Sequence, residues 1–321
     1  LLASLVIFLL ASLGAALAPD YLTFMVFRVL QGAVIAANLL SRAIVRDTSP
    51  PQEATARLAT IGMVTALGPM ISPFFGGLLD EAFGWRATYH AFWVMGLAML
   101  WLCWNDVAET ARSKGKRLAD HARAYGALIR NGMFWSYALS LGLSVGVFFG
   151  FLTGAPLLAA ETFGLSPAIL GIALGAPPIG FVLGNALSVR LSTRLSVGQL
   201  VVLGRVVTLG GMSLALLSWL VTGGSVWSFF GFMPLIGLGN GLTLPAANVG
   251  AMSVEPDLAG SAAGLSGALM VGSGAVMSYL TGALLTGAPD PMRLLALLVA
   301  MSALSLVVAL PVFRHDLSLE A

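Results

Sequence analysis

The sequence predicts an all-α integral membrane protein, and three observations lead to this fold class. Hydrophobic residues make up 58% of the 321 residues and charged residues only 9%, whereas an ordinary soluble domain carries about 25% charged residues. The apolar residues gather in ten long segments, which short polar or Gly- and Pro-containing stretches separate. Twelve of the sixteen Lys and Arg residues fall on one side of these alternating segments. Together, the observations predict ten helices that cross one membrane.

The first four apolar segments, 1–17, 22–45, 56–79 and 87–104, are each predicted to be one membrane helix. About 20 apolar residues in a helix cross the hydrocarbon core of a bilayer. A helix is expected because a backbone amide in lipid must find its hydrogen-bond partner inside its own segment, and the alternation of a membrane barrel is absent. The Gly and Pro residues of 56–79 do not change this assignment, since membrane helices tolerate both.

Six further segments follow a basic stretch and complete the predicted fold. The chain is divided into a partial N-terminal helix bundle (1–110), a basic cytoplasmic connector (111–132) and a C-terminal helix bundle (133–321). The connector holds six basic residues and one acid, and we expect it to maintain the topology and to touch anionic lipid head groups. A regulatory or partner-binding role is the alternative. The segments of the C-terminal bundle are 133–159, 168–187, 200–221, 226–249, 259–285 and 292–312.

The distribution of basic residues predicts the orientation of the helices. Basic residues in short loops are retained on the cytoplasmic side of a membrane. Arg86 and Arg293 lie on the opposite side, while Arg28 and Arg205 lie within apolar segments. Both chain ends are therefore expected on the cytoplasmic side of a bacterial inner membrane. The twelve basic residues on that side are Arg42, Arg46, Arg57, Arg112, Lys114, Lys116, Arg117, Arg123, Arg130, Arg190, Arg194 and Arg314.

The chain also contains an internal repeat. The run GGLL at 76–79, a short loop and a further apolar segment are matched by GALL at 282–285, a short loop and a further segment. Two copies in the same order predict a parallel repeat about an axis along the membrane normal, as in secondary transporters. The later copy has six segments and the earlier one four, so we expect two helices before Leu1. Other matching pairs are Phe27 with Phe232, Leu30 with Leu235, Gly32 with Gly237, Pro51 with Pro256 and Gly62 with Gly267.

Three stretches resemble signatures of a known transporter family. The run FRVLQG at 27–32, followed by small residues and by RAIVRD at 42–47, is similar to the fourth-helix signature of the major facilitator superfamily. The run GPMISPFFGG at 68–77, with Trp85 and Arg86 after it, is similar to the fifth-helix antiporter motif of that superfamily. The pattern most resembles the Bcr/CflA branch of drug and proton antiporters.

This resemblance covers essentially the whole chain and implies a two-bundle fold of twelve helices, of which the chain would hold the third to the twelfth. It also implies a secondary transporter whose two bundles expose a mid-membrane site alternately to each face. Two positions depart from the family pattern. Val34 stands where Gly is frequent, and Ser72 replaces the Gly before the second Pro, so larger side chains occupy positions of close helix packing.

Arg28 and Gln31 are the predicted proton-coupling or substrate-binding residues. Arg28 lies roughly 9 Å of helix rise inside its segment, where an ionisable group is costly unless it faces a polar cavity or a partner. Gln31 lies one turn further along the same face. The resemblance links this arginine to proton coupling. The alternative is an arginine that binds backbone carbonyls of a neighbouring helix and fixes the bundle.

A second candidate group is the Gly and Pro residues of the third segment, Gly68, Pro69, Pro73, Gly76 and Gly77. These residues remove side-chain bulk and amide donors, so the helix can kink and pack closely. They are predicted to form a gate between the two halves. Close helix packing without gating is the alternative.

Polar residues in the later segments are candidates for lining a central path, namely Asn185, Asn240, Asn248 and Tyr279. An amide side chain in lipid requires a hydrogen-bond partner. Simple hydrogen bonds between helices therefore explain each of these residues equally well.

None of the ten segments holds an Asp or Glu deep in its interior. A proton-coupled exchanger needs a group that changes its charge during the cycle. We therefore expect the proton-carrying acid in the helices before Leu1, or a carboxylate there that cooperates with Arg28.

Enzyme, metal and nucleic-acid functions are not predicted. The run GLSG at 264–267 matches the pattern around the serine of intramembrane rhomboid proteases, which need a base such as histidine. His121 and His315 fall in cytoplasmic stretches and His90 near an outer end, whereas Ser266 lies in the inner half of its helix. Close packing of small residues explains this run better. The sequence shows no metal-ligand cluster, no cofactor motif and no nucleic-acid surface.

The predicted function is secondary active transport across the bacterial cytoplasmic membrane. The chain is expected to export drugs or small metabolites by proton antiport and alternating access, as a monomer in the lipid bilayer. A sugar or amino-acid exporter is an alternative within the transporter class. A non-transporting membrane scaffold or a degenerate fragment is the alternative outside it.

Overall fold

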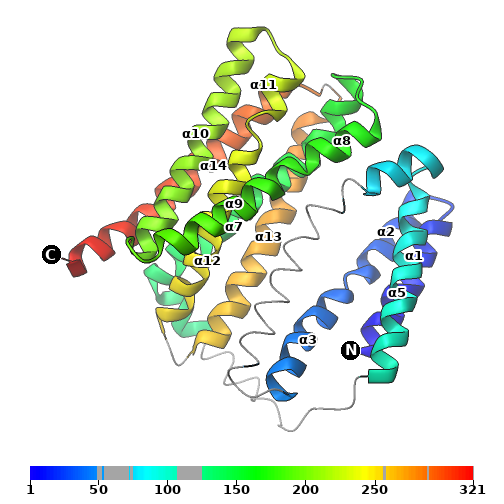
Figure 1. Cartoon of the computed structure of the whole chain (residues 1–321), viewed down its shortest axis with the longest axis horizontal. Helices are drawn as coiled ribbons and strands as arrows, with labels where there is room; N and C mark the ends of the chain where they lie inside the picture. Colours follow the sequence, from blue (N-terminus) through cyan, green and yellow to red (C-terminus); the bar gives the residue numbers. More distant parts are fainter. Residues whose placement is uncertain are drawn as a thin grey trace. The chain divides into compact units, whose positions relative to one another are not determined.

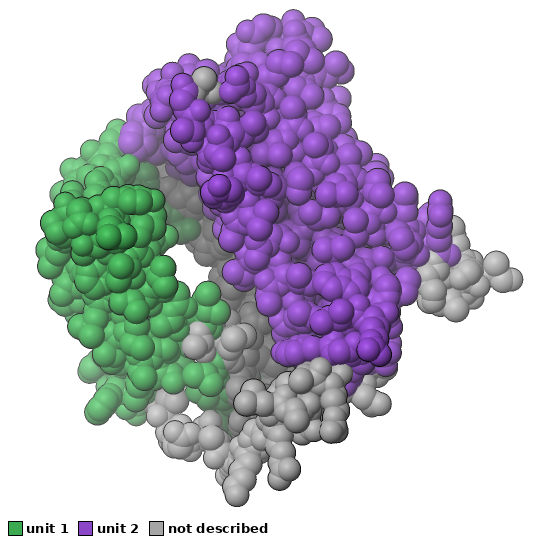
Figure 2. Space-filling view, turned by 180° about the vertical axis from the view of Figure 1, so that it is seen from behind, with its two compact units in different colours: residues 1–115 green, residues 116–321 purple. Residues whose placement is uncertain are grey.

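A computed structural model describes residues 1–48, 53, 72, 75–106, 125–255, 258–287 and 289–320. All regular secondary structure in these residues is helical. The chain forms two compact units, unit 1 (Leu1–Gly115) and unit 2 (Lys116–Ala321), which Figure 2 distinguishes by colour. The boundary between the units falls inside the predicted connector 111–132. Residues 107–124 of that region lie outside the described part, so the connector stays a prediction.

Unit 1 is built around one central helix, α1, which contacts each of the other three that have a label. The buried residues of α1 recur every three to four positions, which places Leu5, Leu9, Ser12 and Ala16 on one helical face. Small residues on this face let neighbouring backbones approach closely. The helices of unit 1 are α1 (Leu2–Leu17), α2 (Tyr21–Gln31), α3 (Val34–Thr48) and α5 (Arg86–Asp106), shown in Figure 1.

Unit 2 holds the remaining labelled helices. The long helix α7 packs against α12, α13 and α14, while α12 also packs against α9 and α10. Side chains of Asn131, Ser166, Ser196 and Ser225 accept the first backbone N–H groups of the helices that follow them. The helices of unit 2 are α7 (Gly132–Glu161), α8 (Pro167–Leu174), α9 (Ala176–Leu191), α10 (Val197–Thr222), α11 (Val226–Phe230), α12 (Pro234–Ser253), α13 (Ala259–Leu285) and α14 (Pro291–Glu320).

Seven helical stretches in the described part of the chain are long and apolar enough to cross a membrane. Of the three remaining predicted segments, the first forms the shorter apolar helix α1. The second, 22–45, is divided between α2 and α3. Most of the third, 56–79, lies outside the described residues. The seven are Arg86–Asn105, Gly132–Glu161, Pro167–Leu191, Val197–Thr222, Val226–Ser253, Ala259–Leu285 and Pro291–Arg314.

The prediction of one continuous helix over 22–45 was wrong, because the helix breaks at Gly32. The amide of Gly32 bonds the carbonyl of Val29, and Ala33 bonds Leu30, both at 3.0 Å. These are the tighter i to i+3 bonds of a 3₁₀ turn, which often mark a hinge. Gly32 offers no Cβ to fill the turn, so the chain re-enters a helix two residues later.

Two further predicted segments are also broken, and proline explains both breaks. Pro177 and Pro178 follow Gly175, and neither can donate the amide that would continue the ladder from α8 into α9. Pro234 plays the same part between α11 and α12, after a turn in which the amide of Met233 bonds the carbonyl of Phe230 at 3.1 Å. The predicted segments 168–187 and 226–249 are therefore each two helices that meet at a bend.

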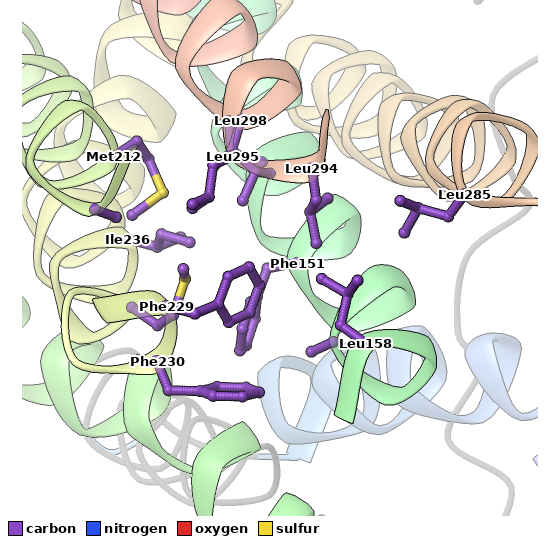
Figure 3. Close-up of a cluster of buried hydrophobic side chains, with 14 residues drawn as sticks. Phe151, Leu158, Met212, Phe229, Phe230, Ile236, Leu285, Leu294, Leu295 and Leu298 are labelled. Carbon is purple, nitrogen blue, oxygen red and sulfur yellow. The ribbon is translucent and has the colours of Figure 1, made fainter. Parts of the chain in front are cut away.

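The apolar core of unit 2 consists of two clusters, one of which is shown in Figure 3. In the cluster of Figure 3, the rings of Phe229 and Phe230 meet edge to face with centroids 4.8 Å apart, and Phe151 lies 6.2 Å from Phe230. Leucines of α14, including Leu294 and Leu298, close the cluster. Because lipid tails are as apolar as these side chains, close packing rather than water exclusion stabilises such contacts.

Glycines bring α9 and α12 into backbone contact. A Cβ added to Gly237 of α12 would overlap the carbonyl of Pro177, and one added to Gly180 of α9 would overlap the carbonyl of Pro234. Gly184 and Gly241 repeat the arrangement one turn further along. The two helices therefore present glycines four residues apart to each other, which is the small-residue spacing of close membrane helix pairs.

Helix ends recur at a constant spacing, which supports the predicted internal repeat. Four ends in unit 1 have a counterpart 205 residues later in unit 2. A parallel repeat requires such a spacing, because the two copies run in the same order. The pairs of helix ends are Leu17 with Thr222, Tyr21 with Val226, Thr48 with Ser253, and Arg86 with Pro291.

Candidate functional site

Arg28 and Gln31 belong to a chain of hydrogen bonds that joins α2 to α1. The Arg28 Nη1 donates to Gln31 Oε1 at 2.9 Å, and Gln31 Nε2 donates to Ser12 Oγ at 2.8 Å. Ser12 Oγ in turn donates to the carbonyl of Phe8 at 2.7 Å. Gln31 and Ser12 are buried, whereas Arg28 is exposed at the end of the chain. The amide of Gln31 therefore holds the guanidinium in one orientation.

Arg28 is also favoured by its place in α2. It lies in the last helical turn before the break at Gly32, where the helix dipole and free carbonyls carry partial negative charge. Its guanidinium carbon lies 5.8 Å from the ring centroid of Tyr89 on α5, within the range of a cation–π contact. A dipole, an amide and an aromatic ring thus stabilise a cation inside a predicted membrane span.

Unit 2 contains a second and more deeply buried polar group, the Arg205 network. Arg205 of α10 is 0% exposed. Its Nε donates to Thr243 Oγ1 at 3.0 Å, and its Nη2 donates to Asn240 Oδ1 at 2.9 Å. Asn240 Nδ2 donates to the carbonyl of Ser144 on α7 at 3.1 Å. One side chain of α10 is thereby connected to α12 and, through Asn240, to α7.

The Arg205 network carries a full charge on neutral partners. The Nη1 of Arg205 is buried without a hydrogen-bond partner in the described part of the chain. Thr243 Oγ1 passes its own proton to the carbonyl of Val201 at 3.3 Å. A buried cation held only by dipoles depends strongly on each of them, because the low dielectric raises the cost of any lost bond.

Sequence reasoning identified Asn240 as a candidate but did not assign Arg205 to a site. The signal was present, since Arg205 lies inside an apolar segment and Asn240 and Thr243 are three residues apart on one helical face. The alternative explanation offered for Asn240, a hydrogen bond between helices, is the geometry that the structure shows.

The other predicted path-lining residues do not share a hydrogen-bonded cluster with Asn240. Asn248 donates to the carbonyl of Leu244 in its own helix at 2.9 Å. Asn185 lies half-buried on α9, and Tyr279 of α13 is 75% exposed. Their role in lining a path stays a prediction.

The predicted gate residues are only partly described. Gly68, Pro69 and Pro73 lie outside the described residues. Gly76 and Gly77 lie in the described helical stretch 75–83, and a Cβ on Gly76 would meet nothing within 4 Å. Within unit 1 itself, Gly76 is therefore free of close contacts. Its role in gating stays a prediction.

Serine 266, which the sequence places in a protease-like run, is buried and donates to the carbonyl of Ala263 at 3.2 Å. This bond within its own helix is typical of serine in membrane helices. Among the described residues, no group of three or more His, Cys, Asp or Glu side chains is placed to hold a metal ion.

Comparison with known proteins relates residues 1–279 to the family model described as Major Facilitator Superfamily. The MFS-type transporter YdgK of Bacillus subtilis (strain 168) is 28% identical over 291 residues, which are 88% of this chain and 71% of YdgK. The multidrug resistance protein MdtL of Escherichia coli (strain K12 / DH10B) is 28% identical over 195 residues, or 60% of this chain. That match spans about half of MdtL, 48% of its length.

Two solved structures share the fold. A bacterial homologue of the human lysosomal transporter Spinster, in an inward-facing and occupied conformation, is similar with a TM-score of 0.72 and 16% identity, over 98% of this chain and 81% of that one. A D-xylose–proton symporter is similar with a TM-score of 0.70 and 15% identity, over 95% of this chain and 78% of that one.

Proposed function

Because the chain belongs to the major facilitator superfamily, a family of membrane transporters rather than enzymes, we propose that it exports drugs or small metabolites by proton antiport. The observation that carries this proposal is the chain of hydrogen bonds from Arg28 through Gln31 to Ser12. A cation held this rigidly in a membrane span is suited to lower the pKa of a nearby acid or to bind an anionic group. Similarity to a protein named as a multidrug transporter supports the export of drugs.

In this proposal Arg28 acts on a carboxylate that lies outside the described residues. When that carboxylate is ionised, it pairs with Arg28. When it is protonated, the pair is broken and the guanidinium falls back on Gln31. The transporter thereby couples one proton-dependent interaction to one arrangement of α1 and α2, and alternating access follows if the two arrangements favour opposite faces.

The helix breaks supply bending points for such a cycle. Gly32, Gly175 and Gly231 each lie where a helix is interrupted by weaker or missing amide bonds. Interrupted helices are a common feature of binding regions in secondary transporters. We propose that the protein acts as a monomer, with small-molecule substrate and protons as its partners.

Substitution of Arg28 by Lys is expected to reduce proton-coupled export at least tenfold or so, because an ammonium cannot reproduce the planar donor geometry that Gln31 accepts. The measurement is efflux of a lipophilic cationic dye, ethidium, from proteoliposomes with and without an imposed pH gradient. Arg293→Lys is the matched control, since Arg293 pairs with Asp290 at 3.8 Å on the surface. Efflux that ignores the gradient in the wild type would refute proton coupling, and equal loss in both variants would refute a specific role for Arg28.

The proposed topology places both chain ends and Lys114 on the cytoplasmic side of the inner membrane, and Asp80 on the outer side. Cys103 is the single cysteine, so a Cys103→Ser protein provides a background for labelling. Lys114→Cys should react with a membrane-impermeant maleimide only after cells are broken, whereas Asp80→Cys should react in intact cells. Labelling of both positions from one side would refute the threading and, with it, transport by this arrangement of helices.

A further inference from the structure

A hollow of about 390 Å³ lies at one end of unit 1, and it contains side chains of both charges. It is formed where α1 ends and where α2 and α5 begin, so it lies at one membrane surface (Figure 1). Its walls combine the acid Asp20, the cation Arg86 and aromatic rings, which gather at membrane–water interfaces. The lining residues are Ala18, Pro19, Asp20, Tyr21, Phe24, Trp85 and Arg86.

The cation of this hollow is held in a fixed orientation. Arg86 Nη2 donates to the carbonyl of Ala18 at 3.2 Å, which joins the start of α5 to the end of α1. The guanidinium lies over Trp85 with its carbon 4.4 Å from the ring centroid, and Trp85 itself meets Phe24 edge to face at 5.5 Å. A planar guanidinium supported in this way can direct its remaining N–H groups towards a phosphate.

The acid of the hollow is also fixed. Asp20 caps α2, because Thr23 donates its backbone amide to Oδ1 at 2.9 Å and its hydroxyl to Oδ2 at 2.8 Å. These bonds, the backbone one first, hold the pKa of the carboxyl below its ordinary value, so the group is ionised at neutral pH. Each carboxylate oxygen retains a second lone pair that can accept a bond from an ammonium group.

The equivalent corner of unit 2 is built differently. The repeat spacing of 205 residues places the neutral Ser225 where unit 1 has Asp20. At the start of α14, Arg293 pairs with Asp290 at 3.8 Å. One copy of the repeat thus has a neutral cap and a neighbouring ion pair, while the other presents an acid and an arginine on the walls of one hollow.

We propose that this hollow binds the head group of a zwitterionic phospholipid, with the lipid phosphate on Arg86 and the primary amine on Asp20. The aromatic rings of Tyr21 and Trp85 cover the glycerol region at the interface. The proposal holds whether or not the protein exports drugs, since it depends only on unit 1 and its contact with lipid. In the proposed topology the lipid belongs to the outer leaflet.

The test is binding of dioctanoyl lipids to the detergent-purified protein, measured by native mass spectrometry. Phosphatidylethanolamine should bind about fivefold more tightly than phosphatidylcholine, whose amine has no N–H to donate, and than phosphatidylglycerol, which has no amine. Asp20→Asn keeps the helix cap and should abolish this preference. Arg86→Gln should weaken both phosphatidylethanolamine and phosphatidylglycerol, while the matched Arg293→Gln in unit 2 should change neither.

Three results would overturn the proposal. Equal binding of phosphatidylethanolamine and phosphatidylcholine by the wild type would show that the amine is not recognised. A preference that survives Asp20→Asn would place the amine elsewhere. Soluble phosphoethanolamine that binds as tightly as the lipid would show a site for a free metabolite instead of a membrane lipid.

Discussion

Replacement of Gly237 by Leu is expected to prevent unit 2 from folding. The glycine of α12 lies against the backbone of α9, where a Cβ would overlap the carbonyl of Pro177 and approach the amide of Phe181 at 2.7 Å. A carbonyl in a helix cannot move aside as a flexible side chain can, so the two helices must separate along their whole length. We expect a loss of more than about 3 kcal/mol, at the upper end of overpacking effects.

Thermal unfolding of the purified protein in detergent, followed by fluorescence and size-exclusion chromatography, measures this effect. Gly210→Leu is the matched control, because Gly210 of α10 is exposed and a Cβ there would meet nothing within 4 Å. The control should unfold at the temperature of the wild type. Equal unfolding temperatures for Gly237→Leu and Gly210→Leu would show that α9 and α12 are not in backbone contact.

Replacement of Asn240 by Leu should destabilise the protein more than replacement of Arg205 itself. In Asn240→Leu the guanidinium of Arg205 stays buried and loses its Nη2 partner, and a hydrogen bond to a charged group is worth about 1.5–3 kcal/mol. In Arg205→Met the charge leaves the interior together with its desolvation cost, and Asn240 keeps its bond to Ser144. We expect a loss of about 3 kcal/mol for Asn240→Leu and about 1 kcal/mol for Arg205→Met.

The double variant Arg205→Met with Asn240→Leu decides whether this reasoning holds. Removal of both members of a buried polar pair can be nearly neutral, so the double variant should be more stable than Asn240→Leu alone. The measurement is again the unfolding temperature in detergent. A double variant whose loss equals the sum of the two single losses would show that the residues do not act as a network.

The sequence was sufficient for the fold because the solvent imposes the strongest rule. In lipid an apolar run of sufficient length has to be a helix, so segments such as 133–159 and 200–221 were predicted with ends close to those of α7 and α10. The break at Gly32 was missed because membrane helices also tolerate glycine without bending. The breaks before Pro177 and Pro234 were missed for a similar reason, since a proline inside a membrane span kinks some helices and interrupts others.

The candidate site could be predicted only where its members are near in sequence. Gln31 was correctly placed one turn from Arg28, and a 2.9 Å bond joins them, because helical periodicity alone brings such residues together. Ser12 was not foreseen as the next member, and neither was the pairing of Arg205 with Asn240. Both contacts join different helices, and apolar periodicity does not specify which helix faces which.

The constant spacing of helix ends is what a tandem gene duplication leaves behind, and the fate of one position shows how the copies diverged. Gly32 and Gly237 are counterparts 205 residues apart. In the first copy the residue interrupts a helix, and a methyl there would touch only the carbonyl of Val29 at 3.0 Å. In the second copy the same ancestral glycine joins two helices instead. Tolerance to mutation in one half therefore cannot be transferred to the other, even at positions that descend from a single codon.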